Sequence, residues 1–204
     1  MPCKGTGMPI EIVLGVEIRQ TVAKEHKMTL VKIDHPDLKI DIVYATANNF
    51  IGEVAYVNAT PMLHPDAADA LYKAAELAKA IGLRLHIWDT YRPQAVQQRF
   101  WNFRPDERFV SNPLKGSDHT RGIAVDLTLE TLNGEMLDMG TGFDASIVQS
   151  YHGATDISPE AQRNRYLLLG IMTTAGFSLL KTEWWHYALP NSVNYPLIED
   201  YDFS

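Results

Sequence analysis

Apolar residues recur at intervals of three and four positions in parts of this chain, and this spacing predicts amphipathic helices. The clearest case is residues 65–81, where the apolar side chains fall on one helical face and a glycine follows as a stop signal. Residues 158–176 show the same periodicity between a Ser-Pro pair, which suits a helix start, and a closing glycine. A shorter helix is predicted over residues 94–101, directly after a proline.

Alternation of apolar and polar residues predicts β-strands around these helices. The segments with this pattern are residues 28–33, 40–44, 83–88 and 122–130, and residues 177–189 are expected to form one or two more strands. Asn133-Gly134 predicts a hairpin turn that returns through residues 136–137. Because regular βαβ alternation is missing, we predict an α+β fold: a single domain with a mostly antiparallel sheet and flanking helices.

Length and composition agree with one compact domain. The chain has 204 residues, of which 46% are hydrophobic, so a sizeable core can form. Residues 28–204 are expected to form this domain, whereas the weakly patterned residues 1–27 are expected to form an N-terminal extension or an edge element. A single cysteine rules out both an intrachain disulfide and a cysteine-rich metal cluster.

Charge and hydropathy limit the partners of the protein. The net charge of −7, without a block of like charges, argues against nucleic acid as a partner, because phosphates call for a basic face. No apolar run is long enough to span a bilayer, and the N-terminus lacks the pattern of a secretory signal. We therefore expect a cytoplasmic protein, or a periplasmic one if a signal peptide has been removed from the given chain; the sequence specifies no oligomeric state.

Two short stretches together predict a catalytic metal site. The first is residues 117–126, which contain His119 and Asp126, and the second is Glu-Trp-Trp-His from Glu183 to His186. They offer two imidazoles, one carboxylate ligand and a further glutamate. Three nitrogen and oxygen ligands with an open fourth position are typical of a catalytic zinc, and the further glutamate suits a general base. The sequence therefore predicts metal-dependent hydrolysis.

Assembly of this site requires two departures from regular strand geometry. His119 precedes the strand that carries Asp126, so the chain must bend back between them, and Gly122 permits such a turn. Along the strand, the small and polar positions share a face with Asp126, and the apolar positions of the opposite face are expected to pack against a helix. Glu183 and His186 would lie on opposite faces of a regular strand, so we expect a bulge, a twist or a strand end there.

With a third motif, Asp-Thr-Tyr-Arg-Pro at residues 89–93, the chain resembles the D-alanyl-D-alanine dipeptidases of the VanX type. These belong to a wider group of zinc D,D-peptidases with a hedgehog-like fold. The family patterns S-x-H-x-x-G-x-A-x-D, E-W-W-H-Y and D-x-Y-R-P are met by residues 117–126, 183–187 and 89–93. The likeness runs from about residue 40 to residue 189 in the same order.

The resemblance implies a set of roles for the metal and the chemistry. One zinc ion per catalytic site would be bound by His119, Asp126 and His186. Glu183 would act as the general base, and Arg92 would stabilise the negative charge that develops on the scissile carbonyl oxygen. Without the family, Arg92 would be interpreted as a surface arginine at a helix start, paired with the aspartate three residues before it.

The resemblance also implies a substrate-binding set. Asp144 resembles the position that holds the substrate ammonium group, and Ser117 and Tyr44 are candidates for contact with the dipeptide. The partner expected from this set is a small dipeptide.

The main hypothesis is zinc-dependent hydrolysis of D-Ala-D-Ala to two D-alanines. One alternative is a D,D-carboxypeptidase acting on peptidoglycan precursors, which an open groove or a secretion signal would indicate. Another is a non-catalytic zinc-binding interaction domain of hedgehog-like fold, which would need neither Glu183 nor Arg92. An iron oxygenase with two histidines and one carboxylate is formally compatible with the ligand types, but it would leave Glu183 without a task.

Overall fold

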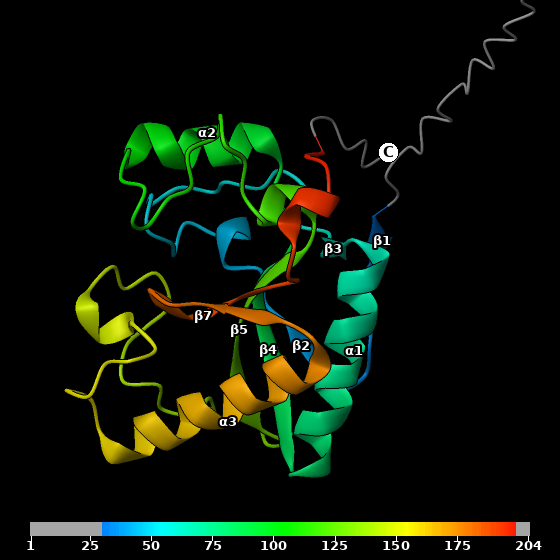
Figure 1. Cartoon of the computed structure of the whole chain (residues 1–204), viewed down its shortest axis with the longest axis vertical. Coiled ribbons are helices and arrows are strands. Elements are labelled where there is room, and N and C mark those ends of the chain that lie inside the picture. The colour runs from blue at the N-terminus through cyan, green and yellow to red at the C-terminus, as the bar shows by residue number, and fades with distance from the viewer. Residues whose placement is uncertain (1–29, 199–204) are drawn as a thin grey trace, which may run out of the picture.

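The computed structural model describes residues 30–198, and the extension predicted over residues 1–27 lies outside the described residues. A five-stranded sheet forms the centre, with two long helices packed against it and a shorter helix at the opposite end of the molecule from α3 (Figure 1). The helices are α1 (Pro65–Ala80), α2 (Gln94–Phe103) and α3 (Pro159–Ala175). None of the helices in this part of the chain is both long and apolar enough to cross a membrane.

The strands and short helices follow the order of the chain. The strands are β1 (Val31–Lys32), β2 (Leu38–Ile40), β3 (Met62–Leu63), β4 (Leu83–Asp89), β5 (Ala124–Thr131), β6 (Ser178–Leu180) and β7 (Glu183–Ala188). The single-turn 3-10 helices are η1 (Val43–Ala45), η2 (His119–Arg121), η3 (Val148–Ser150) and η4 (Ser192–Asn194).

The central sheet has the strand order β2-β4-β5-β7-β6. The β2–β4 pair is parallel and the three other pairs are antiparallel. The predicted α+β fold with a mostly antiparallel sheet is therefore confirmed. The last strand along the chain, β7, lies inside the sheet between β5 and β6, and β1 and β3 form a separate two-stranded ladder.

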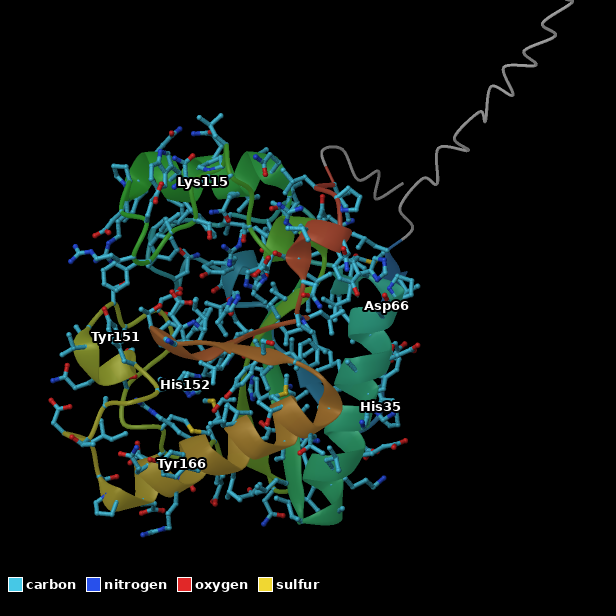
Figure 2. All side chains as sticks on the ribbon, viewed as in Figure 1. His35, Asp66, Lys115, Tyr151, His152 and Tyr166 are labelled. Carbon is cyan, nitrogen blue, oxygen red and sulfur yellow. The ribbon has the colours of Figure 1, made fainter. Side chains whose placement is uncertain are left out.

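The main hydrophobic core lies between the sheet and the two long helices. Val125, Leu127 and Leu129 of β5 are fully buried in one cluster with Leu71 of α1 and Leu168 of α3, and side chains fill this layer (Figure 2). Burial of each such side chain contributes roughly 1.5–3 kcal/mol. The prediction that the apolar face of the strand carrying Asp126 packs against helices is confirmed, and this packing anchors the strand.

The helix ends follow the capping signals in the sequence. The Oγ of Ser158 accepts a hydrogen bond from the backbone N of Ala161 at 3.0 Å, so Ser158 is the N-cap of α3. Gly176 closes this helix with φ of 117°, a left-handed conformation that favours glycine. At the start of α1, the ring of His64 takes the N-cap position, because its Nδ1 accepts from the backbone N of Asp66 at 3.1 Å.

The strand predicted over residues 40–44 is wrong for all but its first residue. The strand β2 ends at Ile40, and the chain then turns into η1. Tyr44 is buried, its ring lies 4.7 Å from that of Phe100, and its backbone O accepts hydrogen bonds from Ala55 and Tyr56. Aromatic packing and these loop hydrogen bonds outweigh the alternation of residue types.

Three other strand predictions need shorter bounds. Of the segment 28–33, only Val31–Lys32 forms a strand, and residues 28–29 lie outside the described part of the chain. The strand predicted from Gly122 begins at Ala124, because Gly122 has a positive φ. The turn after β5 forms as predicted, but the returning segment makes only an isolated bridge between Met136 and Glu130.

Candidate metal centre and active-site pocket

His119 lies in η2, a single helical turn that bends the chain back towards the start of β5. Gly122 ends this turn with φ of 70°, and a Cβ atom there would lie 2.6 Å from Cδ2 of Leu30. Both the backbone conformation and the close approach favour glycine. The turn that Gly122 was predicted to permit, which returns His119 to Asp126, is confirmed.

The described C-terminal residues hold the same turn from outside. The backbone N of Ile198 donates to the O of Thr120 at 3.0 Å, and the hydroxyl of Tyr91 donates to the O of Ile198 at 3.3 Å. Nη1 of Arg121 donates to the O of Tyr195 at 2.5 Å. These contacts fix the backbone that carries His119.

Strand register places three polar residues side by side across the sheet. Asp126 of β5 is paired directly with His186 of β7 on one side and with Asp89 of β4 on the other. Directly opposed residues on neighbouring strands project from the same face at about 4.5–5.5 Å between Cβ atoms. The register therefore brings an imidazole and two carboxylates together without any contribution from a loop.

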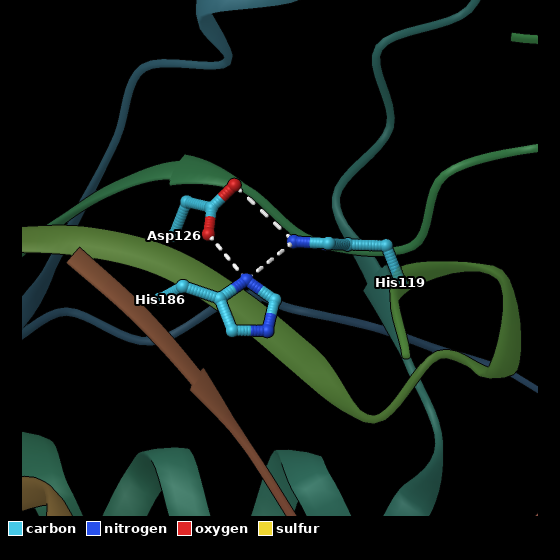
Figure 3. A group of neighbouring side chains, drawn as sticks. All are labelled: His119, Asp126 and His186. Atoms are coloured by element: carbon cyan, nitrogen blue, oxygen red, sulfur yellow. Dashed lines mark hydrogen bonds and ion pairs between the residues drawn. The ribbon is translucent and has the colours of Figure 1, made fainter. Parts of the chain in front are cut away.

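The donor atoms of His119, Asp126 and His186 converge on one point (Figure 3). Nε2 of His119 lies 3.2 Å from Oδ2 of Asp126, and Nδ1 of His186 lies 3.0 Å from Oδ1 of Asp126. The two imidazole nitrogens are 3.2 Å apart. Ligands about 2.0–2.1 Å from a tetrahedral zinc are separated by roughly 3.3 Å, so this donor set fits a zinc ion.

Hydrogen bonds orient the ring of His119 for this task. Its Nδ1 lies 2.6 Å from the backbone O of Thr90, and because a carbonyl only accepts, Nδ1 carries the proton and Nε2 keeps its lone pair. Burial raises the pKa of the Asp126 carboxyl, but the neighbouring His119 and His186 outweigh it and hold that pKa well below its usual range. Asp126 is therefore ionised, as a ligand must be.

Glu183 is the first residue of β7, at the point where the pairing of β6 and β7 shifts register between Leu179 and Leu180. The strand end and the irregularity that the spacing of Glu183 and His186 required are both present. Glu183 lines the same cavity as His186. Burial raises the pKa of Glu183 to about 8, and the nearby carboxylates of Asp126 and Asp144 act in the same direction.

Arg92 is paired with Asp89, but it is not a surface residue. Its side chain is 10% exposed, and both Nε and Nη2 donate to Oδ2 of Asp89, at 3.1 and 2.8 Å. The guanidinium carbon lies 5.4 Å from the ring centre of Tyr44 and 4.9 Å from that of Phe100. Burial alone would lower the pKa of Arg92. Asp89, with smaller effects from its other acidic neighbours, outweighs burial and holds that pKa well above its usual value, so the guanidinium stays charged.

The predicted substrate-binding residues form another part of the wall. The hydroxyl of Tyr44 donates to Oδ2 of Asp144 at 2.8 Å, and Oγ of Ser117 accepts from the backbone N of His119 at 3.2 Å. Asp144 has φ of 57°, which is uncommon for a residue with a side chain and costs of order 1–3 kcal/mol. Burial and the charge of Asp126 raise the pKa of Asp144 to about 7, although the bond from Tyr44 acts against them.

All the residues predicted for the site line one cavity of about 180 Å³. They are Tyr44, Arg92, Ser117, His119, Asp126, Asp144, Glu183 and His186. The sequence assigned no role to residues 107–111, a loop that lines the same cavity, or to Trp185, which also lines it. Two adjacent apolar residues in this otherwise polar loop, Phe109 and Val110, are the sequence signal that could have indicated this wall.

Comparison with known proteins identifies the family. A model of the D-Ala-D-Ala dipeptidase family, a family of metallopeptidases, matches residues 24–202. The chain belongs to this family. Its match to the family includes the cavity residues and every element of the central sheet.

Several named dipeptidases are similar to this member of the D-Ala-D-Ala dipeptidase family. A D-alanyl-D-alanine dipeptidase of Escherichia coli is 46% identical over 165 residues, which cover 81% of this chain and 86% of the relative. One of Enterococcus faecium is 37% identical over 182 residues, covering 74% and 88%. Among solved structures, the D,D-pentapeptidase VanY in complex with Zn(II) aligns with 65% of this chain and 75% of its own, at a TM-score of 0.44 and 15% identity. Family membership therefore rests on the sequence matches.

Proposed function

We propose that this member of the D-Ala-D-Ala dipeptidase family hydrolyses D-Ala-D-Ala to two D-alanines with one zinc ion. The observation that carries the proposal is the convergence of three donor atoms, all within 4.8 Å of one another, in a cavity that Glu183 and Arg92 also line. A structural zinc site is closed by four protein ligands, whereas residues 30–198 offer three to this site. The relatives named as D-alanyl-D-alanine dipeptidases support the choice of substrate.

His119, Asp126 and His186 would hold the zinc. When bound, the ion supplies a Lewis acid that polarises the scissile carbonyl and lowers the pKa of water in the open position. As metal ligands the two imidazoles would be neutral donors and Asp126 would be ionised, so the site would bring one negative charge towards a doubly positive ion. Thr90 keeps the His119 ring oriented during turnover through its backbone carbonyl.

Glu183 moves the proton. Its carboxylate takes a proton from the attacking water and later gives it to the nitrogen of the leaving D-alanine, so the water is consumed and two amino acids result. Without a cation, burial raises the pKa of Glu183 to about 8. A zinc ion in the adjacent site adds positive charge, which favours the ionised form that a base needs.

Arg92 stabilises the charge that develops on the carbonyl oxygen. A guanidinium that is already fixed and partly dehydrated needs no rearrangement as the negative charge grows. It therefore stabilises the transition state more than the ground state, and the barrier falls. The hydrogen bonds to Asp89 and the rings of Tyr44 and Phe100 supply this fixed position.

The size and charge of the cavity favour a free dipeptide as the substrate. Drug-sized ligands occupy pockets of about 300–1,000 Å³, and this cavity of about 180 Å³ is smaller. Asp144 would pair with the substrate ammonium group, and the hydroxyl of Tyr44 would hold the Asp144 carboxylate in place. Ser117, which accepts a hydrogen bond from the backbone N of His119, would contact the dipeptide.

The test is an assay of the purified protein on D-Ala-D-Ala, L-Ala-L-Ala and N-acetyl-D-Ala-D-Ala, each with and without a chelator. We expect cleavage of D-Ala-D-Ala alone, loss of activity on chelation and recovery with added zinc. Efficient cleavage of the acetylated substrate would favour the carboxypeptidase. Zinc binding without cleavage of any substrate would favour the non-catalytic domain.

A further inference from the structure

Asp89 is fully buried, and both of its carboxylate oxygens accept hydrogen bonds. Oδ1 accepts from the hydroxyl of Tyr56 at 2.7 Å and from the backbone N of Thr90 at 2.9 Å. Oδ2 accepts two bonds from the guanidinium of Arg92. A buried charge with this many partners is stabilised strongly, and it has little freedom to move.

The guanidinium of Arg92 lies between two competing carboxylates. Its Nη2 is 2.8 Å from Oδ2 of Asp89 and 3.6 Å from Oδ2 of Asp126. Nη1 donates to Oε1 of Gln97 at 3.0 Å, and Gln97 is itself fully buried. The bonds to Asp89 and Gln97 hold the guanidinium, and its contact with Asp126 stays an ion pair longer than a hydrogen bond.

The length of that contact matters because Asp126 is also the carboxylate of the metal centre. Oδ2 of Asp126 is the oxygen closest to Nε2 of His119, at 3.2 Å, so it faces the donor set. A guanidinium bonded to this oxygen would occupy a lone pair and bring positive charge to the place where a cation binds. Arg92 must lie near the metal centre to act on the substrate, but it must not form a hydrogen bond with the metal ligand Asp126.

We propose that Asp89 is a positioning residue that holds Arg92 towards the substrate cavity and away from Asp126. This inference rests on the proposed zinc site and gives the Asp89–Arg92 ion pair two roles. Asp89 fixes the direction of the guanidinium, and it also protects the affinity of the site for its metal.

Replacement of Asp89 by asparagine has two expected consequences. The amide keeps the shape of the side chain but loses its charge, so the nearest carboxylate left for Arg92 is Asp126. The guanidinium then shortens its 3.6 Å contact with Oδ2 of Asp126 to a hydrogen bond. Zinc affinity falls because the cation repels the metal, and turnover falls because the guanidinium no longer points at the carbonyl oxygen.

The experiment measures zinc affinity and turnover for Asp89→Asn, Arg92→Ala and the double variant. Zinc affinity is measured by competition with a chromophoric chelator, without substrate. We expect Asp89→Asn to weaken zinc binding by about 10- to 100-fold, the usual effect of losing a residue that supports a ligand. Arg92→Ala should bind zinc as tightly as the parent protein, and the double variant should recover that affinity.

Turnover supplies a second, independent reading of the same pair. If Asp89 acts through Arg92, the loss of kcat in Asp89→Asn is absent when the substitution is made in the Arg92→Ala background. The loss should fall on kcat more than on KM. A zinc affinity unchanged by Asp89→Asn, or still low in the double variant, would overturn the proposal.

Glu130 provides a matched control. It is also a buried carboxylate of the sheet, held by Arg84 and by His86 at 2.7 Å, and it does not line the cavity. Glu130→Gln should lower the free energy of unfolding but leave zinc affinity and kcat unchanged. If Asp89→Asn does not fold, Asp89→Glu keeps the charge and displaces the carboxylate, and it should lower kcat in the parent but not in the Arg92→Ala background.

The outcomes separate this proposal from the proposed function. A parent protein that binds no zinc would refute the metal site itself. A parent that binds zinc and cleaves D-Ala-D-Ala, with Asp89→Asn behaving like the parent, would refute only the role of Asp89.

Discussion

The carboxylates of the cavity are chemically alike, yet their surroundings separate their behaviour. Asp126 is kept ionised by two imidazoles, whereas burial raises the pKa values of Asp144 to about 7 and of Glu183 to about 8. Groups whose environments push their pKa values apart are suited to different tasks in one reaction. The lowered pKa sets Asp126, the proposed ligand, apart from Asp144 and Glu183. The proposed roles of Asp144 and Glu183 rest on their positions in the cavity wall.

The first prediction separates base from ligand. Glu183→Gln keeps the size of the side chain but cannot take a proton, so kcat should fall by about 10²–10⁴. Zinc content should stay near one ion per chain, because the donor set excludes Glu183. The measurement is metal analysis beside steady-state kinetics. Near-normal turnover would remove Glu183 from the mechanism, and loss of zinc would make it a ligand.

The second prediction concerns substrate choice. Asp144→Asn removes the charge proposed to pair with the substrate ammonium group, so kcat/KM for D-Ala-D-Ala should fall by roughly 10- to 100-fold. The kcat/KM for N-acetyl-D-Ala-D-Ala should change little, so the preference for the free dipeptide over the acetylated one should fall. Asp156→Asn, which removes an exposed carboxylate outside the cavity wall, serves as the control. A fall of equal size for both substrates would exclude Asp144 from ammonium recognition.

Turns and strand register, more than any single side chain, determine the shape of the site. Gly122 supplies the conformation that returns His119 to β5, and the β5–β7 pairing aligns His186 with Asp126. The core packing of Val125 and Leu127 then holds β5 in that register.

The third prediction tests the turn. Gly122→Ala forces a side chain into a left-handed conformation, which costs about 1–2 kcal/mol, and its Cβ would also meet Leu30 at 2.6 Å. Gly134→Ala is a matched control, because φ there is 89° and nothing lies within 4 Å. Denaturant unfolding should show a loss of stability in both variants, and zinc affinity should fall only in Gly122→Ala. Equal zinc affinity in the two would show that the turn does not control His119.

The sequence predicted elements whose signals are local. Ser158 and Gly176 mark the ends of α3, and the residue patterns placed Asp126 on β5 and Glu183 and His186 on the later strand β7. It failed where distant packing decides, as at Tyr44, which was predicted in a strand but lies in η1 with its ring packed against that of Phe100. The roles of residues 107–111 and the restraint of Arg92 by Asp89 depend on tertiary contacts, which no local pattern encodes.

At the scale of the whole molecule, the proposed zinc links parts of the chain that are far apart. His119 and His186 are separated by 67 residues, and Asp126 and His186 by 60. The unfolded chain does not hold these donors together, so zinc binds the folded state preferentially and stabilises it.

The fourth prediction follows from this linkage. With free zinc at about 1,000 times Kd, the added stability is about 4 kcal/mol, which raises Tm by roughly 8–16 °C for a domain of this size. Calorimetry of the protein with zinc and with chelator measures the shift. His186→Ala should show little or none of it. A Tm that does not respond to chelation would argue against a metal at this centre.

The position of β7 has a consequence for how the protein is made. Synthesis proceeds from the N-terminus, so His119 and Asp126 leave the ribosome well before His186, and β5 waits with one edge uncovered until β7 inserts between it and β6. The same strand, β7, carries both His186 and Glu183. A chain that ends before β7 therefore lacks both His186 and Glu183, the proposed third ligand and the proposed base. On the proposed mechanism, hydrolytic activity requires that β7 is in place.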